Sequence, residues 1–162
     1  MQRFSLGDTA VHPMHGAGTV EEIQNRRVDG AEREYYVLRL AGEGLRILVP
    51  VDTAQSIGLR PVVSSAEARQ LLEEIPGLSV EMDNNWNKRY RENMARIRTG
   101  DIRMLAAVAR CLTTRDAGRT LSTGERKMLN SIKQILASEL VLALELTMQE
   151  AQTQLEARLA WK

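Results

Sequence analysis

The sequence predicts an α+β protein of two domains, a small N-terminal β-barrel at residues 1–55 and an all-α bundle of about five helices at residues 56–162. In the first part, short runs rich in Val, Ile and Tyr alternate with turn signals, which is typical of a small, strongly bent barrel. From Val51 on, the apolar residues recur at helical spacing and capping patterns precede the runs.

The predicted strands of the barrel are short, and turn signals separate them. The strands are expected at residues 8–13, 18–24, 34–40 and 45–49, with turns at 14–17, 28–30 and 42–44. Alternation in the third strand places Tyr36, Leu38 and Leu40 on one face. A barrel of this size has little core, so its exposed edges are places where a partner can add a strand.

The predicted helices of the second domain follow from apolar periodicity and from capping residues. They are expected at residues 65–75, 86–99, 101–115, 122–145 and 147–160. Capping boxes are expected for Ser64 with Glu67, Ser122 with Glu125, and Thr147 with Glu150. Asn85 is expected to cap the helix from Trp86, and Gly100 to end it before Asp101 caps the next. Helix 122–145 has the widest apolar stripe, which indicates a central place in the bundle.

Charge is unevenly distributed in this chain, whose net charge is only +1. Residues 61–85 carry a net charge of −4, whereas residues 86–127 carry +7. Such a concentration indicates a polyanionic partner, although a solvated helix face is the ordinary alternative. The loop and helix start at 115–127 contribute Arg115, Arg119, Arg126 and Lys127. The last two lie in a first helical turn, where the helix dipole disfavours cations, and this indicates an external anion.

Trp86 lies at the start of the basic segment, within the stretch Asn84–Arg91. On a helix that begins at Trp86, the same stripe holds Tyr90, Met94 and Ile97, which favours packing of the ring on the bundle. Its place in the first turn, after a polar loop, would instead let the ring project toward nucleic acid. The residues alone leave both interpretations open.

No catalytic or metal-binding constellation is expected. His15-Gly16-Ala17-Gly18 lacks the Lys-Ser/Thr of a phosphate-binding loop, and two histidines with one cysteine give too few ligands for zinc. Cys111 falls in a helical apolar pattern and is expected to be a small buried hydrophobe. The sequence has neither a membrane-spanning run nor the apolar region of a signal peptide, so we expect a cytoplasmic protein without a cofactor.

An ordered set of segments resembles the CarD family of bacterial RNA-polymerase-binding transcription regulators. The segments are Phe4–Asp8, Val11–Gly18, Glu34–Leu38, Val49-Pro50, Gly58–Arg60, Asn85–Tyr90 and Leu121–Leu129. The resemblance implies a Tudor-like N-terminal barrel that binds the RNA polymerase β subunit by strand pairing. It implies a helical domain that contacts promoter DNA at the upstream edge of the bubble, where a Trp wedge in the minor groove stabilises the open complex. We expect a monomeric, non-enzymatic regulator that is associated with the nucleoid through the polymerase.

The resemblance also assigns roles residue by residue. For DNA, Trp86 matches the wedge, Lys88, Arg89 and Arg91 match its phosphate-contacting neighbours, and Arg126 and Lys127 match a second basic pair. For RNA polymerase, Arg26 matches a basic docking position. Some members carry Arg directly before the Val-Pro pair, where this chain has Leu48. Arg46, two residues earlier on the same strand face, is the candidate substitute.

Two alternatives belong to other functional classes. A protein-interaction adaptor would dock a partner through the Tudor-like barrel and never contact DNA, and its Trp86 should be buried. The second alternative is a fragment of an enzyme, because a similar barrel occurs in transcription–repair coupling helicases. The sequence holds no nucleotide-binding motif, which argues against independent helicase activity.

Overall fold

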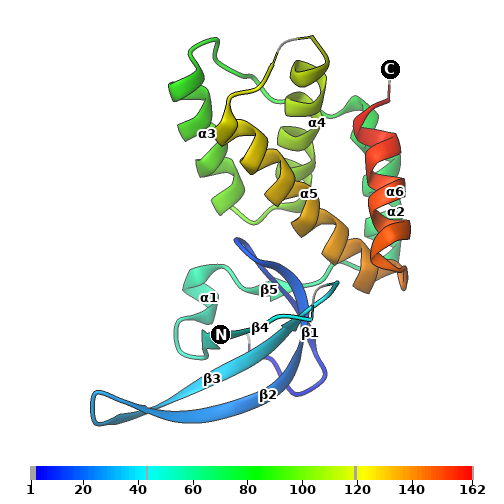
Figure 1. Cartoon of the computed structure of the whole chain (residues 1–162). Coiled ribbons are helices and arrows are strands. Elements are labelled where there is room, and N and C mark those ends of the chain that lie inside the picture. The colour runs from blue at the N-terminus through cyan, green and yellow to red at the C-terminus, as the bar shows by residue number, and fades with distance from the viewer. Residues whose placement is uncertain (1–2, 43, 119, 162) are drawn as a thin grey trace.

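The computed structural model describes residues 3–42, 44–118 and 120–161, so Glu43 of a predicted turn and Arg119 of the predicted basic loop lie outside it. Figure 1 shows a β-sheet at one end of the molecule and a helical bundle at the other. The elements are β1 Thr9–His12, β2 Gly16–Val28, β3 Ala31–Leu40, β4 Arg46–Pro50, α1 Ala54–Ile57, β5 Arg60–Pro61, α2 Ser65–Glu74, the 3₁₀ helix η1 Ile75–Gly77, α3 Trp86–Arg98, α4 Ile102–Gly118, α5 Thr123–Leu144 and α6 Met148–Leu159. The predicted α+β fold class is confirmed.

The sheet is antiparallel, with the strand order β4-β3-β2-β1-β5. Strands β4 and β5 are its two edges, so the bent barrel remains open. The predicted alternation of β3 is confirmed, because Tyr36 and Leu38 are buried and Leu40 is half-buried on the same face. An open barrel leaves the outer side of β4 available for another strand.

Strands β2 and β3 extend beyond β4 as a long hairpin arm (Figure 1). Its turn has positive φ at both Asp29 (52°) and Gly30 (79°), as two-residue hairpin turns of this hand require. A register shift lies between Val20 and Glu22, so Glu21 is the extra residue of a bulge. Bulges increase local twist, and this one lies just past Thr19, the last residue of β2 that pairs with β1.

The sheet has its own apolar core, which extends past the predicted domain boundary. Ala54 and Leu59 are buried in the same cluster as Tyr36 and Leu38. Strand β5 pairs with β1 through Arg60 and Pro61. The sheet and its core therefore include residues up to Pro61, and strand β5 was not predicted because a two-residue strand carries almost no sequence pattern.

The five predicted helices are all present, and α5 is the central one. Its buried residues include Ile132, Ile135, Leu136 and Leu140, which pack on several neighbouring helices. Ser64, Asn85, Ser122 and Thr147 all cap helices as expected. Only Thr147 forms the full reciprocal box. In the part of the chain that the structure describes, no helix combines the length and apolarity that crossing a membrane would require.

Candidate nucleic-acid interface

The start of α3 is fixed by three hydrogen bonds from main-chain N–H groups to side chains. Asp83 accepts from the Asn85 N–H at 2.8 Å, and the Asn85 side chain accepts from the N–H groups of Asn87 and Lys88, both at 3.0 Å. The Asn85 N–H, and next the Lys88 ammonium, lower the pKa of Asp83 from its ordinary value. This Asx-type cap sets the point where Trp86 enters the helix.

Trp86 projects from the first turn of α3 and leaves 57% of its surface exposed. Tyr90 and Met94 are half-buried against the bundle core, and Ile97 is buried in it. The ring of Tyr90 lies over Gly124 of α5, where an added Cβ would come within 3.3 Å of it. The apolar stripe therefore anchors α3 while its first member remains in solvent, so the burial expected for an adaptor is not observed.

Arg89 does not face solvent, contrary to its predicted role as a phosphate contact. Its side chain is only 4% exposed and donates to the Glu125 carboxylate at 2.6 Å and 2.8 Å. It also donates to the main-chain oxygens of Asp83 and Asn84. Bonding to Arg89, the largest effect, lowers the pKa of Glu125, and the same bond raises the pKa of Arg89. Arg89 is thus the structural partner that ties α3 to α5.

The remaining predicted cations differ in how far neighbouring acids neutralise them. The Lys88 ammonium lies 3.2 Å from Asp83 and 3.9 Å from Glu92. Arg126 pairs with Asp116 at 3.1 Å, and both side chains are partly exposed. Arg91 and Lys127 are exposed and form no ion pair with any residue that the structure describes.

The flank of α3 that holds Arg91 also carries Arg98, which the residue assignments from sequence did not include. The two residues are seven apart, so at about 100° per residue they lie on one side of the helix. Arg98 is exposed and, within the described ranges, has no ion-pair partner. Lys88 lies between Arg91 and Arg96 around the helix, and both Lys88 and Arg96 lie near Glu92. The helical spacing of Arg91 and Arg98 was the sequence signal for this pair.

A cleft of about 230 Å³ lies between α3 and α5, beside the unpaired cations. Tyr90 and Met94 line it from α3, Lys127 and Ser131 from α5, and Met14 from the β1–β2 turn. Its walls are mostly apolar, and Lys127 adds a charged side chain to them. Around α3, Arg91 and Arg98 follow next to Met94, so we group Trp86, the cleft and the cations Arg91, Arg98 and Lys127 as the α3–α5 face.

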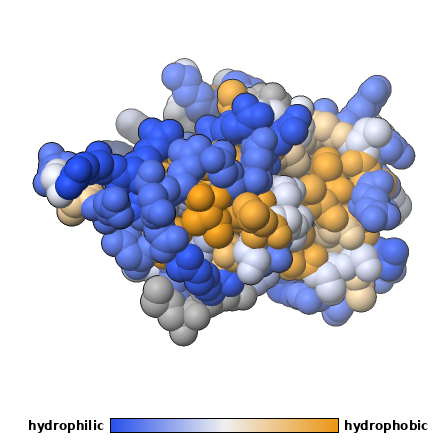
Figure 2. Space-filling model, turned by 90° about the horizontal axis from the view of Figure 1, so that it is seen from below, coloured by the Kyte–Doolittle hydropathy of each residue, from blue (hydrophilic) through white to orange (hydrophobic). Residues whose placement is uncertain are grey.

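The residues assigned to polymerase docking lie on two parts of the sheet. Arg46 and Leu48 are exposed on one face of the edge strand β4, and Leu48 is 41% exposed. Arg46 forms a double hydrogen bond with Glu21, at 2.8 Å and 3.0 Å, and this bond lowers the pKa of Glu21. Figure 2, seen from the sheet end, shows apolar patches among hydrophilic side chains on this side of the molecule.

Arg26 lies on the hairpin arm, opposite Arg33 of β3, and its Nε donates to Gln24 at 3.0 Å. The pairing of β3 with β4 places Leu48 opposite Val37. Arg33 and Val37 are four positions apart on an extended strand, which corresponds to about 13 Å. The structure does not bring Arg26 into contact with Arg46 or Leu48, although all three lie on the sheet domain.

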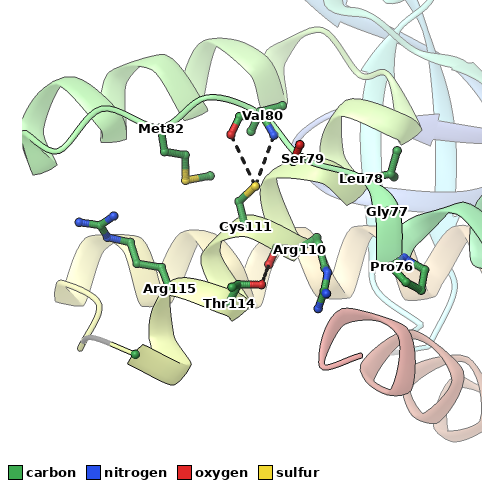
Figure 3. A pocket seen from close by; sticks show the side chains of 11 residues that line it. Pro76, Gly77, Leu78, Ser79, Val80, Met82, Arg110, Cys111, Thr114 and Arg115 are labelled. Atoms are coloured by element: carbon green, nitrogen blue, oxygen red, sulfur yellow. Dashed lines mark hydrogen bonds between the residues drawn. The ribbon is translucent and has the colours of Figure 1, made fainter. Parts of the chain in front are cut away.

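A second groove, of about 560 Å³, lies between the segment Pro76–Met82 and α4 (Figure 3). Cys111 is half-buried here and points at Val80, whose N–H donates to Sγ at 3.4 Å and whose oxygen accepts from it at 3.6 Å. The expected full burial of Cys111 is therefore wrong, because an irregular segment rather than a helix covers it. Within residues 3–42, 44–118 and 120–161, no group of three or more potential metal ligands occurs.

In comparison with known proteins, the chain matches two family models and is similar to a bacterial protein. The model described as "CarD, C-terminal domain" matches residues 67–156, and the model described as "CarD-like/TRCF RID domain" matches residues 4–63. A Bacillus subtilis (strain 168) protein named "Putative transcription factor YdeB" is 31% identical over 137 residues, which cover 85% of this chain and 90% of the relative. The two family models meet close to the junction of sheet and bundle.

Proposed function

Because this chain belongs to the CarD family of transcription regulators, which are not enzymes, we propose that it binds the β subunit of RNA polymerase and stabilises the promoter open complex. The sheet domain docks on the polymerase. The α3–α5 face contacts DNA at the upstream edge of the bubble, and Trp86 acts there as a wedge in the minor groove.

The observation that carries the DNA half of the proposal is the exposure of Trp86 beside cations without acidic partners. Arg91, Arg98 and Lys127 have no ion-pair partner among the described residues, so their charges are available to phosphate. Phosphate contacts position a protein on DNA without reading sequence, and an apolar wedge can occupy a partly unstacked base step. Such contacts fit a regulator that acts at many promoters.

Only small changes in the free energy of the open complex are needed for regulation. A change of about 1.4 kcal/mol in the stability of the open complex alters its equilibrium constant tenfold. Unstacking a base step costs a few kcal/mol, and an inserted aromatic ring offsets part of that cost. Docking on the polymerase would supply a high effective concentration at the bubble, so weak intrinsic affinity for DNA is sufficient.

The free edge of β4 supports the polymerase half of the proposal. The Leu40 N–H donates to Leu45 and the Val51 N–H donates to Glu34, and in an antiparallel pair the bonded positions alternate. By this alternation, the main-chain groups of Arg46 and Leu48 point away from β3. A strand of the β subunit can therefore pair with them, while the exposed side chains of these residues select the partner.

The salt dependence of DNA binding should separate the unpaired cations from the paired ones. Arg91→Ala, Arg98→Ala and Lys127→Ala are each expected to reduce the slope of log K against log [salt] by about 1, since each removes one phosphate contact. Lys88→Ala is the matched control on α3, and it should leave the slope nearly unchanged because Asp83 holds that ammonium. Fluorescence anisotropy with a labelled forked promoter duplex measures these slopes.

The same titration can contradict the proposed DNA-contacting face. If Lys88→Ala lowered the slope as much as Arg91→Ala, Lys88 would meet phosphate as well, and ion pairing would not separate the cations that bind DNA from those that do not. If none of the four variants changed the slope, the α3–α5 face would have no role in DNA binding.

A further inference from the structure

An ion pair between a partly exposed arginine and a buried glutamate joins the sheet to the helical bundle. Arg60 of β5 donates to both carboxylate oxygens of Glu139, at 2.8 Å and 2.7 Å, and the Val63 N–H donates to the same carboxylate at 3.0 Å. Glu139 lies in the C-terminal third of α5 and is fully buried. Arg60 belongs to the Gly58–Arg60 segment of the sequence, which has no role in docking or DNA contact as proposed above.

A second contact brings the backbone of β2 against α5. The Ala17 N–H donates to the Ser138 hydroxyl at 2.9 Å, and that hydroxyl donates to the Ile135 oxygen at 2.6 Å. At Gly16, which has a φ of +100°, an added Cβ would lie 2.7 Å from the same hydroxyl oxygen. Only glycine permits this approach of strand to helix.

The third contact reaches the helix that carries Trp86. The Nε of Arg60 donates to the main-chain oxygen of Gly100 at 2.8 Å. Gly100 has a φ of +71° and lies directly after the end of α3. One guanidinium therefore touches the sheet, α5 and the end of α3. With 13 residues, α3 spans about 20 Å from this contact to Trp86.

These polar contacts connect two apolar cores that have no buried residue in common. Each part can therefore keep its own packing when the connection between them is weakened. We propose that Arg60, Glu139, Ser138 and Gly16, the interdomain joint, position Trp86 at a fixed distance from the docking edge β4. This inference rests on the proposed function, because a fixed distance matters only if both ends are engaged at once.

The consequence concerns effective concentration at the bubble. With the joint intact, docking of β4 places Trp86 in one location. With the joint loosened, the same docking spreads Trp86 over a larger volume, and its concentration at the bubble edge falls although no contact residue has changed. The joint residues are thus positioning residues rather than DNA-binding residues.

The test measures the joint and the function separately in the full chain. In a Cys111→Ser background, spin labels at Gln55→Cys and Gln152→Cys report the distance between sheet and bundle by double electron–electron resonance. Glu139→Gln is expected to broaden this distance distribution, to retain binding to the isolated polymerase β lobe within about twofold, and to lose most of the extension of open-complex lifetime. Ser138→Ala, which removes the one hydrogen bond that its side chain makes to the sheet, should give the same changes in smaller degree.

Matched controls keep the inference separate from the proposed function. Lys133 lies on α5, as Glu139 does, and pairs with Glu156 of α6 within the bundle. Lys133→Gln breaks that ion pair and should change neither the distance between sheet and bundle nor the lifetime of the open complex. If Glu139→Gln broadens the distribution but keeps the lifetime while Trp86→Ala shortens it, the positioning role is wrong. If Trp86→Ala also leaves the lifetime unchanged, the proposed function fails instead. Should Glu139→Gln not fold, as judged by circular dichroism, Ser138→Ala decides.

Discussion

Arg89→Ala is expected to lower the free energy of unfolding by about 3–5 kcal/mol, because it leaves the Glu125 carboxylate buried without its partner. The two side chains are only 5% and 1% exposed, so solvent cannot replace the lost bonds. The substitution also frees the main-chain oxygens of Asp83 and Asn84, which lie directly before α3. Urea unfolding followed by circular dichroism measures the change.

The double variant Arg89→Met with Glu125→Leu is the control for this expectation, because removing both charges abolishes the desolvation cost. It should recover most of the stability that Arg89→Ala loses. A loss below about 1 kcal/mol for Arg89→Ala would mean that the pair does not tie α3 to α5, since exposed pairs contribute that little.

The pH dependence of the same pair has a definite sign. Arg89 lowers the native pKa of Glu125, so the pair stabilises the fold above the ordinary glutamate value of about 4.3. This contribution is lost as the pH falls through the lower native pKa. In Arg89→Ala the same carboxylate is buried without its partner, and burial raises its pKa. The difference in stability between wild type and Arg89→Ala should therefore be largest at neutral pH and shrink as the pH falls through that raised pKa toward the native one.

Leu48→Pro is expected to weaken binding to the isolated polymerase β lobe by tenfold or more. By the alternation of bonded positions, the Leu48 N–H points outward from β4, and proline removes it without breaking a bond to β3. An edge strand tolerates proline where the lost N–H has no partner within the sheet, so the sheet should remain folded. Biolayer interferometry with the immobilised lobe measures the affinity.

Leu48→Ala is the matched control, because it shortens the side chain but keeps the N–H. Strand pairing predicts that it binds the lobe more tightly than Leu48→Pro. Arg46→Glu places a second carboxylate beside Glu21 and should also weaken binding, through charge rather than through the main chain. Wild-type affinity for Leu48→Pro would exclude β4 as the docking strand.

Much of the fold could be predicted because its signals are local. Ser64, Asn85, Ser122 and Thr147 act within one helical turn, so the helix starts followed directly from the sequence. The alternation that buries Tyr36 and Leu38 is equally local. Strand β5 escaped prediction because two residues cannot show a period, and its place in the sheet depends on β1, far away in the sequence.

The candidate site was predicted less completely because the positions of charged residues in the sequence do not show which of them form ion pairs in the folded chain. Arg89 and Glu125 lie 36 residues apart, and nothing in either neighbourhood indicates that they bond. Composition places Lys88 and Arg91 in the same basic segment, whereas only the folded chain shows that Asp83 holds Lys88. The spacing of seven residues between Arg91 and Arg98 indicates a shared side of α3, but it does not indicate that both lack acidic partners.

The most direct test of the proposed wedge is the lifetime of promoter open complexes formed with wild type, Trp86→Ala and Trp161→Ala. Trp161 is equally exposed, at 62% against 57% for Trp86, but lies after α6 rather than on the α3–α5 face. Trp86→Ala should shorten the lifetime about tenfold relative to wild type, as expected for a loss near 1.4 kcal/mol, with binding to the β lobe unchanged. Trp161→Ala should match wild type. A wild-type lifetime with Trp86→Ala would contradict the wedge.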